Sequence, residues 1–325
     1  MSTLQDLVAA RHLIAPYIRR TPLVPSRPLS ERAGTSVHLK LECLQETGSF
    51  KVRGAANRIL ALADAERARG VVAVSTGNHG RAVAYVAGRL GIPATVCISE
   101  RVPPGKAEAI RRLGARIAVH GASYDEAEAY ARALQREQGL VFVEPFDDPL
   151  VIAGQGTIGL ELLEDLPEVD MAVVPLSGGG LVGGIAVALK AADPRIRVVG
   201  VSMERAPVMV RSLQAGRPLA LPEEETLADA LAGGIGLENH HTFRLVQRHV
   251  DDTVLVSEDE IAAAMAWALR EHHLVVEGGG AVGLAALLSG KAAGRGRPVA
   301  VVLSGGNVGQ ETLARAAAGG GPPHP

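Results

Sequence analysis

The sequence has almost no net charge and few aromatic residues. Among its 325 residues, 33 Lys and Arg stand against 35 Asp and Glu, which gives a formal net charge of -2, and aromatic residues make up 3%. Nucleic-acid binding depends on a basic surface and often on aromatic stacking, and this chain supplies little of either. We therefore expect no nucleic-acid partner and no attraction to an anionic membrane surface.

Signals for disulfides and for membranes are also missing. Cys43 and Cys97 are too few for a disulfide framework, and neither belongs to a CxxC motif. No apolar run approaches the ~18 residues that span a bilayer, and the amphipathic N-terminus is unlike a signal peptide. These absences predict a cytoplasmic protein in which both cysteines are buried.

Glycine is the residue in excess. The chain has 38 glycines, about 12% against a usual ~7%, without the G-X-Y period of collagen. Hydrophobic residues make up 47%, enough for a sizeable core. The places where the glycines fall therefore carry more information than their number.

Short β-rich runs alternate with amphipathic stretches along the chain. Such alternation predicts βαβ units and parallel sheets that are buried on both faces. The predicted strands are Val71–Ser75, Ala94–Ile98, Arg116–His120, Val141–Val143, Met171–Leu176, Arg197–Ser202, Thr253–Val256 and Pro298–Leu303. The predicted helices are Phe50–Ala65, Gly80–Leu90, Lys106–Leu113, Asp125–Glu137, Val151–Asp165, Leu181–Ala192, Glu258–Glu271 and Gly280–Leu288.

The predicted strands fall into two groups. Four lie between Val71 and Val143, the others follow from Met171 onward, and the segment Glu144–Pro149 is the expected crossing point. Ligands of such folds bind beyond the carboxyl ends of the strands. We therefore expect two α/β domains with the active site in the cleft between them.

A glycine-rich loop follows the strand Met171–Leu176. It reads SGGGLVGG from Ser177 to Gly184 and opens a helix, so free amides and the helix dipole favour a phosphate there. The alternative is tight helix–sheet packing without a ligand. The loop also fits the dinucleotide pattern G-x-G-x-x-G, but so does Gly278–Gly283, and Glu204 is poorly placed as the acidic partner of NAD. An NAD-binding protein is thus the weaker alternative.

Two further polar loops follow predicted strands. Residues 75–80 read STGNHG, where Ser75 or Thr76 is expected to cap the next helix and the amides can receive a carboxylate. His79 is either a general base or, as we favour, a capping or packing residue. The third loop reads SGGN at Ser304–Asn307. All three loops can converge on one site.

Lys51 lies where a helix disfavours a cation. With Ser49 as the expected N-cap, Lys51 falls in the first turn, at the positive end of the helix dipole. A solvated surface lysine is the ordinary alternative. A lysine used covalently as an imine is neutral and removes the conflict. Together with a phosphate loop, this lysine points to pyridoxal 5'-phosphate (PLP).

Five motifs together carry a family resemblance. The run LECLQETGSFKVRGA at Leu41–Ala55 resembles the lysine motif of fold-type II PLP enzymes of the serine/threonine dehydratase and serine racemase family. STGNHG at 75–80, AGQGTIGLEL at 153–162, SGGGL at 177–181 and LSGGN at 303–307 extend the resemblance over nearly the whole chain. In finer detail the chain looks like the hydroxyectoine-utilisation dehydratase branch of this family. The motifs concerned are STGNHGRAVAY at 75–85, VSMER at 201–205, LADALAGGIG at 227–236 and VVEGGGAVG at 275–283.

The resemblance implies a tryptophan synthase beta-like fold with two parallel-sheet α/β domains. Residues 1–62 and 148–318 would form the large PLP domain and residues 63–147 the small substrate-side domain, with a disordered tail at 319–325. The family is usually dimeric, so we expect a homodimer. The chain ends soon after Asn307, so we expect no regulatory domain of the kind found in biosynthetic threonine dehydratases.

The same resemblance assigns the cofactor contacts. Lys51 would form the Schiff base with PLP, and Phe50 would lie against the cofactor ring. Asn78 would hydrogen-bond the 3-hydroxyl oxygen, and Ser304 would meet the pyridine nitrogen. The phosphate would be held by Ser177, Gly178, Gly179, Gly180 and Leu181, where a hydroxyl at the first position can also donate.

Substrate contacts and chemistry follow from the family as well. Lys51 would remove the Cα proton of a hydroxy-amino acid, whose β-elimination of water leads to a 2-oxo acid and ammonia. Thr76 stands where racemases carry a serine, so a racemase or a plain serine/threonine dehydratase is the alternative. The substrate carboxylate would be held, largely by backbone amides, at Ser75, Thr76, Gly77 and His79.

The chain also departs from the family pattern. Ala230 and Gly278–Gly279 replace residues usual near the substrate, and we expect the extra glycines at Gly278–Gly280 and Gly233–Gly236 to accommodate an unusual substrate. Ser202 and Val208 stand where some relatives carry cation ligands, so we predict no metal site. The substrate identity is left open between threonine, serine and a compound from hydroxyectoine breakdown.

Overall fold

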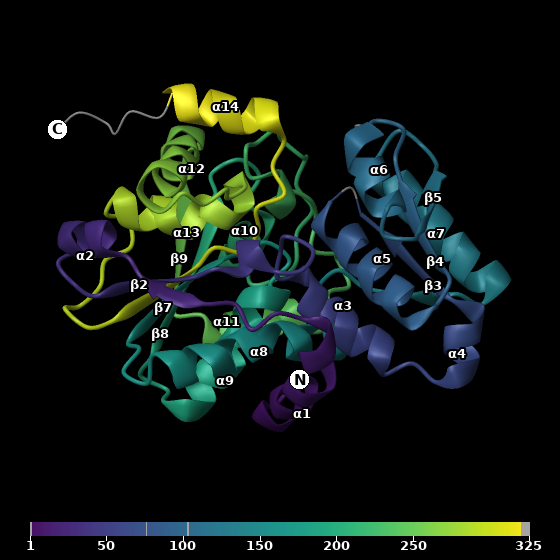
Figure 1. The fold of residues 1–325 in the computed structure, drawn as a ribbon, viewed down its shortest axis with the longest axis horizontal. Helices are drawn as coiled ribbons and strands as arrows, with labels where there is room; N and C mark the ends of the chain where they lie inside the picture. Colours follow the sequence, from purple (N-terminus) through teal and green to yellow (C-terminus); the bar gives the residue numbers. More distant parts are fainter. Residues whose placement is uncertain (1, 76, 103, 320–325) are drawn as a thin grey trace.

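Two mainly parallel sheets with helices on both faces make up the structure, a computed structural model that describes residues 2–75, 77–102 and 104–319 (Figure 1). The expected α/β class with two parallel sheets is confirmed. The strands are β1 (Leu23–Pro25), β2 (Val37–Lys40), β3 (Val71–Val74), β4 (Ala94–Ile98), β5 (Arg116–Val119), β6 (Val141–Phe142), β7 (Met171–Pro175), β8 (Arg197–Met203), β9 (Asp252–Val256) and β10 (Val299–Val302).

Helices connect these strands, as a parallel sheet requires. The α-helices are α1 (Leu4–Ile14), α2 (Arg27–Ala33), α3 (Lys51–Leu60), α4 (Asp64–Arg69), α5 (Asn78–Leu90), α6 (Pro104–Arg111), α7 (Tyr124–Gln138), α8 (Pro149–Asp165), α9 (Gly180–Ala192), α10 (Val208–Ala215), α11 (Thr242–His249), α12 (Glu258–His272), α13 (Gly278–Leu288) and α14 (Gln310–Gly319). Short 3-10 turns are η1 (Ala15–Tyr17), η2 (Glu42–Leu44) and η3 (Asp229–Leu231).

The larger sheet has the strand order β1-β2-β10-β7-β8-β9. β1 runs antiparallel to β2, and the other neighbouring pairs are parallel. The two N-terminal strands therefore complete a sheet whose other members come from the second half of the chain. Because β10 and β7 are parallel neighbours, the SGGN loop and the glycine-rich loop leave the same edge of the sheet side by side.

Successive residues of the central strands enter different hydrophobic clusters. In β7, Met171 and Val173 pack with side chains of α12 and α13, whereas Ala172 and Val174 pack with side chains of α8 and α9. Strand side chains alternate between the two faces, so a strand covered on both sides needs apolar residues throughout. Figure 1 shows α12 and α13 on one side of this sheet and α8 and α9 on the other.

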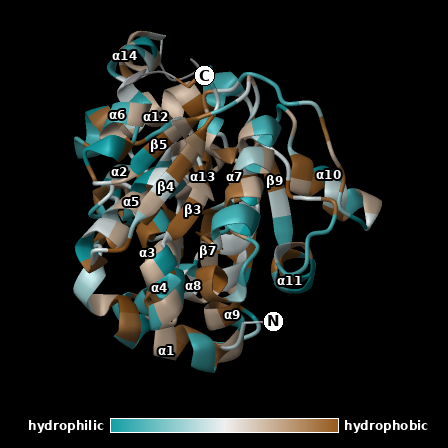
Figure 2. Cartoon of the chain, turned by 90° about the vertical axis from the view of Figure 1, so that its right-hand side faces the viewer, coloured by the Kyte–Doolittle hydropathy of each residue, from teal (hydrophilic) through white to brown (hydrophobic). Residues whose placement is uncertain are grey.

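The smaller sheet has the order β5-β4-β3-β6, with all neighbours parallel. Val71 and Ala73 of β3 pack in one cluster with α5, and Val72 and Val74 pack in another with α7. Figure 2 shows the strongly hydrophobic β3 among these helices. Cys97 lies in the second of these clusters, and Cys43 is also buried, as the sequence predicted.

All eight predicted strands are present, with ends shifted by at most one residue. β1 and β2 were not predicted, because β1 has three residues and β2 contains polar His38 and Lys40 instead of a continuous apolar run. The predicted helix Phe50–Ala65 is wrong at residues 61–63, where the structure has a break, since α3 ends at Leu60 and α4 begins at Asp64. A new helix begins there because Glu66 Oε2 accepts the Ala63 amide at 2.9 Å.

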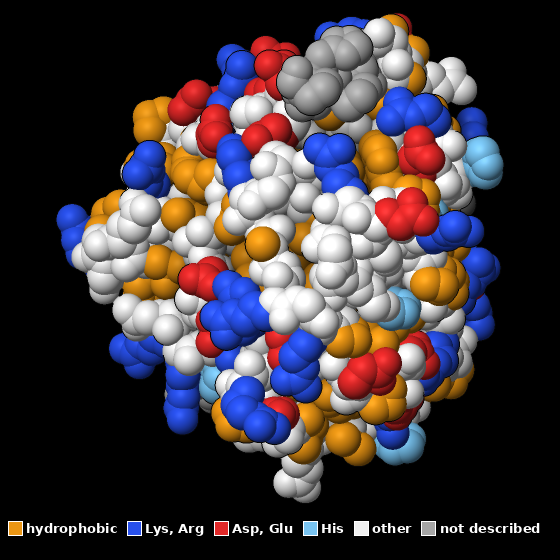
Figure 3. Space-filling view, turned by 90° about the vertical axis from the view of Figure 1, so that its left-hand side faces the viewer, with side chains coloured by type: hydrophobic (Ala, Val, Ile, Leu, Met, Phe, Trp, Pro, Cys, Tyr) orange, Lys and Arg blue, Asp and Glu red, His pale blue; other side chains and the backbone are white. Residues whose placement is uncertain are grey.

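The described surface mixes charges of both signs. Figure 3 shows Lys and Arg side chains interspersed with Asp and Glu on one face of the molecule. Among the described residues, no helix combines the length and the apolar character needed to span a membrane. The domain boundaries expected at residues 62/63, 147/148 and 318/319 stay predictions.

Candidate active site

Four helices that begin at or beside the predicted site residues have no side-chain cap among the described residues. Among the described residues, the first amides of α3, α5, α9 and α13 donate to no capping side chain, whereas those of α1, α2, α7, α8 and α12 donate to a Thr, Ser or Asp cap. The first amides of a helix have no partner within the helix and carry its positive dipole end. Four uncapped helices therefore offer donors to an anionic ligand.

The loop after β10 joins two of these helices. Ser49, just before α3, forms an isolated bridge with Gly305, and the Phe50 amide donates to Ser304 O at 3.0 Å. The Glu277 amide, just before α13, donates to Gly305 O at 3.0 Å. Ser304, the expected partner of the pyridine nitrogen, is thus buried directly beside Phe50, the expected ring contact.

Lys51 is the first residue of α3, so it lies in the first turn of the helix, as the sequence predicted. Its Nζ donates to Pro145 O at 2.7 Å and lies 5.3 Å from the centre of the Phe50 ring. Burial lowers the pKa of Lys51 to about 8, and the charge of Glu277 partly opposes this shift. The predicted cap was wrong, because Phe50 occupies the N-cap position and the buried Ser49 hydroxyl has no hydrogen-bond partner among the residues that the structure describes.

The glycine-rich loop contacts the residue next to Pro145. A Cβ at Gly178 would lie 2.4 Å from Phe146, so the loop backbone packs directly on that ring. Gly179 has φ +87° in the left-handed region, which favours glycine, and directs the chain into α9. Lys51 and the expected phosphate loop therefore meet at residues 145–146. The Ser177 hydroxyl donates to Leu231 O at 2.9 Å, so its only proton is not directed at a phosphate as expected.

The STGNHG loop is partly described, since Thr76 lies outside the described residues. Gly77 is the N-cap of α5, so the expected capping by Ser75 is wrong; its hydroxyl accepts the Gly77 amide at 3.1 Å instead. Buried His79 donates from Nε2 to Val143 O at 2.8 Å. Burial and the charge of Lys51 lower its pKa to about 3. A histidine with a pKa this low and with its Nε2–H bound to a carbonyl is a weak base, which favours the packing role that we predicted.

Glu277 is a site residue that the sequence did not single out for a role. Asn78 Nδ2 donates to Glu277 Oε1 at 2.6 Å, and Asn307 Nδ2 donates to Asn78 Oδ1 at 2.6 Å. Arg81 Nη1 donates to Asn307 Oδ1 at 2.9 Å. Burial raises the pKa of Glu277 to about 7 against the opposing Asn78 bond. The only sequence signal was an acidic residue directly before the glycine run that opens α13.

The extra glycines of α13 do not enlarge the site as expected. A Cβ at Gly278 would lie 2.1 Å from Leu227 O, and one at Gly280 would lie 2.5 Å from Gly305 O. At Gly279 a Cβ would lie 3.2 Å from the Ala230 Cβ. Neighbouring atoms occupy the space that a side chain at these glycines would take, so the glycines give no added room for a larger substrate.

Two cavities in the chain lie away from this region. One, of about 240 Å³, is lined by Arg197 and Lys291, and the other, of about 310 Å³, is lined by Lys190 and Arg248. Neither cavity is lined by any of the site residues described above. Within the described residues no group of three or more His, Cys, Asp and Glu side chains is placed to hold a metal ion.

Comparison with known proteins decides the family. Residues 14–305 match the family model described as "Pyridoxal-phosphate dependent enzyme". The chain belongs to this family. An L-threonine ammonia-lyase of Thermotoga maritima is 47% identical to this PLP enzyme, over 95% of this chain and 76% of the relative.

Solved structures agree with this assignment. A T.th. threonine deaminase has a TM-score of 0.87 at 43% identity, covering 94% of this chain and 99% of that one. Maize serine racemase has a TM-score of 0.91 at 37% identity, covering 98% and 97%. The expected tryptophan synthase beta-like fold, membership of the threonine dehydratase and serine racemase family, and PLP as cofactor are confirmed. The NAD-binding alternative is set aside.

The described residues fit PLP. The lowered pKa of Lys51 favours the free amine that attacks an aldehyde, and the uncapped start of α9 suits a phosphate dianion. Phe50 offers a ring at the same place, and Ser304 lies next to it. Lys51, Phe50, Asn78, Ser304 and the loop 177–181 would hold the cofactor; these individual roles remain predictions.

Proposed function

We propose that this PLP enzyme is an ammonia-lyase that eliminates water from L-threonine, and less efficiently from L-serine. The proposal rests chiefly on one observation: the half-buried Lys51, whose Nζ donates to Pro145 O and whose pKa is lowered to about 8, meets the glycine-rich loop at residues 145–146. The name and the 47% identity of the Thermotoga maritima relative favour threonine as the substrate.

Lys51 would carry the proton. When bound, PLP supplies an electron sink that makes the Cα proton of an attached amino acid acidic. Lys51 Nζ, as the free amine, would take that proton, and its return to the β-hydroxyl would let the hydroxyl leave, so that Cα–H and Cβ–OH together give one water. Hydrolysis then consumes one water, so that a hydroxy-amino acid gives a 2-oxo acid and ammonia in balance. A base with a pKa near the working pH suits this transfer.

Backbone amides would hold the two anionic ends. The loop 177–181 at the start of α9 binds the phosphate, with Ser177 contributing its amide because its hydroxyl is engaged by Leu231. The start of α5, at Gly77 and His79, binds the substrate carboxylate, with Ser75 and Thr76 completing the loop. Asn78, oriented by Glu277 and Asn307, keeps one N–H for the cofactor 3-hydroxyl oxygen.

Finer expectations stay predictions. A role in hydroxyectoine breakdown rests on the sequence resemblance alone, and the packed glycines of α13 give it no added support. Racemisation of serine is the alternative for the same site and depends on Thr76. A homodimer is expected from the family.

A substrate panel tests the proposal. Ammonia and 2-oxo acid are followed with L-threonine, L-serine, β-hydroxyaspartate and hydroxyectoine-derived diamino acids, and the chirality of residual serine is measured. We expect equal amounts of both products, with the highest kcat/KM for L-threonine. Lys51→Ala is expected to lower kcat by at least ~10²-fold, the low end for a general base, whereas the distant Lys190→Ala is not.

The panel also names the outcomes that contradict the proposal. Accumulation of D-serine without 2-oxo acid would make the protein a racemase. A higher kcat/KM for a diamino acid would replace threonine by the hydroxyectoine alternative. No ammonia from any compound would remove the lyase activity altogether.

A further inference from the structure

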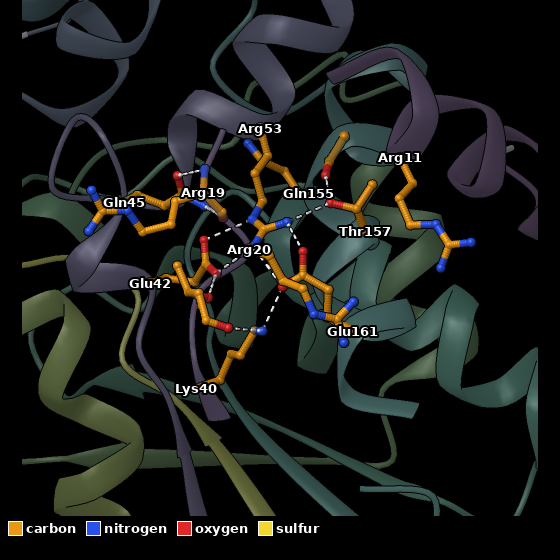
Figure 4. Close-up of polar contacts among 12 residues, drawn as sticks. Arg11, Arg19, Arg20, Lys40, Glu42, Gln45, Arg53, Gln155, Thr157 and Glu161 are labelled. Carbon is orange, nitrogen blue, oxygen red and sulfur yellow. Dashed lines mark hydrogen bonds and ion pairs between the residues drawn. The ribbon is translucent and has the colours of Figure 1, made fainter. Parts of the chain in front are cut away.

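Four charged side chains lie buried together behind the helix that carries Lys51. Lys40, Glu42 and Arg53 are 0% exposed and Glu161 is 3% exposed. Figure 4 shows them meeting from β2, η2, α3 and α8. Two positive charges balance two negative ones, yet apolar residues of similar volume often stabilise a fold as well as such a cluster does. Stability alone therefore does not explain the cluster.

Arg53 uses all five of its N–H donors in this cluster. Nε and Nη2 donate to the two carboxylate oxygens of Glu42 at 2.9 and 2.8 Å. Nη1 and Nη2 donate to Glu161 at 2.7 and 2.9 Å, and Nη1 also donates to Thr157 Oγ1 at 3.0 Å. A guanidinium held by two carboxylates on different edges is fixed in direction as well as in place.

Lys40 connects the cluster to the larger sheet. Its Nζ lies 2.5 Å from Glu161 Oε2 and donates to Thr21 O at 2.7 Å. The Thr21 hydroxyl donates in turn to Glu42. Lys40 belongs to β2, which pairs with β10, and β10 leads directly to Ser304. The cluster thus joins α3 to the sheet that carries an expected cofactor contact.

Lys51 and Arg53 lie on opposite sides of α3. Two residues along an α-helix correspond to a rotation of about 200°. Lys51 Nζ reaches Pro145 O on one side, while Arg53 reaches Glu42 on the other. Within the described part of the chain, no side-chain cap anchors the first turn of α3. The guanidinium clamp supplies a polar anchor to this turn, and close packing at Gly154, where a Cβ would lie 2.5 Å from Arg53 O, limits any shift.

We propose that Arg53 is a positioning residue, whose clamp by Glu42 and Glu161 sets the place and direction of the Lys51 amine. The proposal rests on the proposed function, in which Lys51 binds the cofactor and moves the Cα proton. Arg53 itself does not reach the reacting atoms. Its contribution is to fix the first turn of α3 from the side opposite to Lys51, so that the Lys51 amine keeps its position during the reaction.

Three variants separate positioning from stability. Arg53→Lys keeps the charge but offers three donors from one nitrogen, which cannot grip two carboxylates as a planar fork does. Glu161→Gln keeps the shape but removes one charge of the clamp. Arg58→Lys is the matched control, because Arg58 lies on the same helix and pairs at 3.2 Å with Asp148, which caps α8. The readouts are Tm, the Kd for PLP, the fraction of Lys51 trapped with PLP by borohydride, and kcat and KM.

Arg53→Lys is expected to lower kcat by about 100-fold, the scale of a 1 Å misplacement by a remote change, with little change in KM. It should also raise the Kd for PLP and reduce trapping of Lys51. Glu161→Gln should change the same quantities in the same direction, and Arg58→Lys should change none of them. Comparing the variants at matched fractions of folded protein removes the effect of Tm.

A purely structural role has a distinct signature. If Arg53→Lys lowers Tm but keeps the kcat, the Kd for PLP and the Lys51 trapping of Arg58→Lys, the proposal is wrong. If Arg53→Lys does not fold, wild-type behaviour of Glu161→Gln overturns it. Should the wild-type protein eliminate no amino acid, the proposed function fails, but PLP affinity and Lys51 trapping still test the role of Arg53.

Discussion

Asn78 and Glu277 share a hydrogen bond of 2.6 Å between helices that flank different sheets. Asn78 opens α5 beside the smaller sheet, and Glu277 precedes α13 beside the larger one. The charge of Glu277 raises the pKa of Lys51 against the effect of burial. One carboxyl group therefore both orients the expected cofactor contact and tunes the amine.

Replacing Glu277 by Gln tests this coupling. The amide keeps an oxygen for Asn78 but removes the negative charge, so the pKa of Lys51 should fall below about 8. The measurement is the rate of acylation of Lys51 against pH in the PLP-free protein, read by mass spectrometry. Glu204→Gln, at an exposed carboxylate, is the control. An unchanged midpoint in Glu277→Gln would show that the two groups are not coupled.

Gly179→Ala tests the phosphate loop. At φ +87° an alanine costs about 1–2 kcal/mol, and its Cβ would also lie 2.9 Å from Val246 Cγ2. We expect a lower Tm together with a clear rise in the Kd for PLP. Gly34→Ala is the matched control, since Gly34 has φ +63° with no atom within 4 Å of a built Cβ. Equal Kd values for PLP in both variants would argue against this loop as the phosphate site.

His79 should stay neutral through the pH range in which an ordinary histidine titrates. Its pKa is about 3 in the folded protein against an ordinary value of 6.5, so the unfolded state binds a proton first as the pH falls. The contribution of His79 to stability is therefore present above pH 6.5 and is lost as the pH falls from 6.5 to about 3. NMR titration of the His79 ring, assigned with His79→Gln, measures this directly. A midpoint near 6.5 would contradict the buried Nε2–Val143 bond.

Much of the fold could be predicted from the sequence because strands buried in a parallel sheet consist of short runs of consecutive apolar residues. Strands such as Ala94–Ile98 carry that signal in a few consecutive residues, which is why their ends matched. β2 escaped prediction because Lys40 is buried through a pairing with Glu161, a residue far along the chain. The pattern of a single strand cannot reveal a partner that only the folded chain supplies.

The site residues also fall into those that a local sequence pattern predicts and those that only the folded chain reveals. Lys51 and the glycine loop were found because their chemistry conflicts with, or depends on, local helix geometry. Glu277 and Arg53 were not assigned roles because theirs depend on partners that come together only in the fold. Ser49 was assigned as a cap on local grounds, and the structure instead pairs its backbone with Gly305.

The most direct test of the proposed site is to locate the lysine that binds PLP. The wild-type protein is incubated with PLP, reduced with borohydride, digested and mapped by mass spectrometry. We predict that the modified peptide carries the label on Lys51, and that Lys51→Ala loses both the label and ammonia release from L-threonine. A label on another lysine, or full activity in Lys51→Ala, would contradict the assignment of Lys51 as the reacting amine.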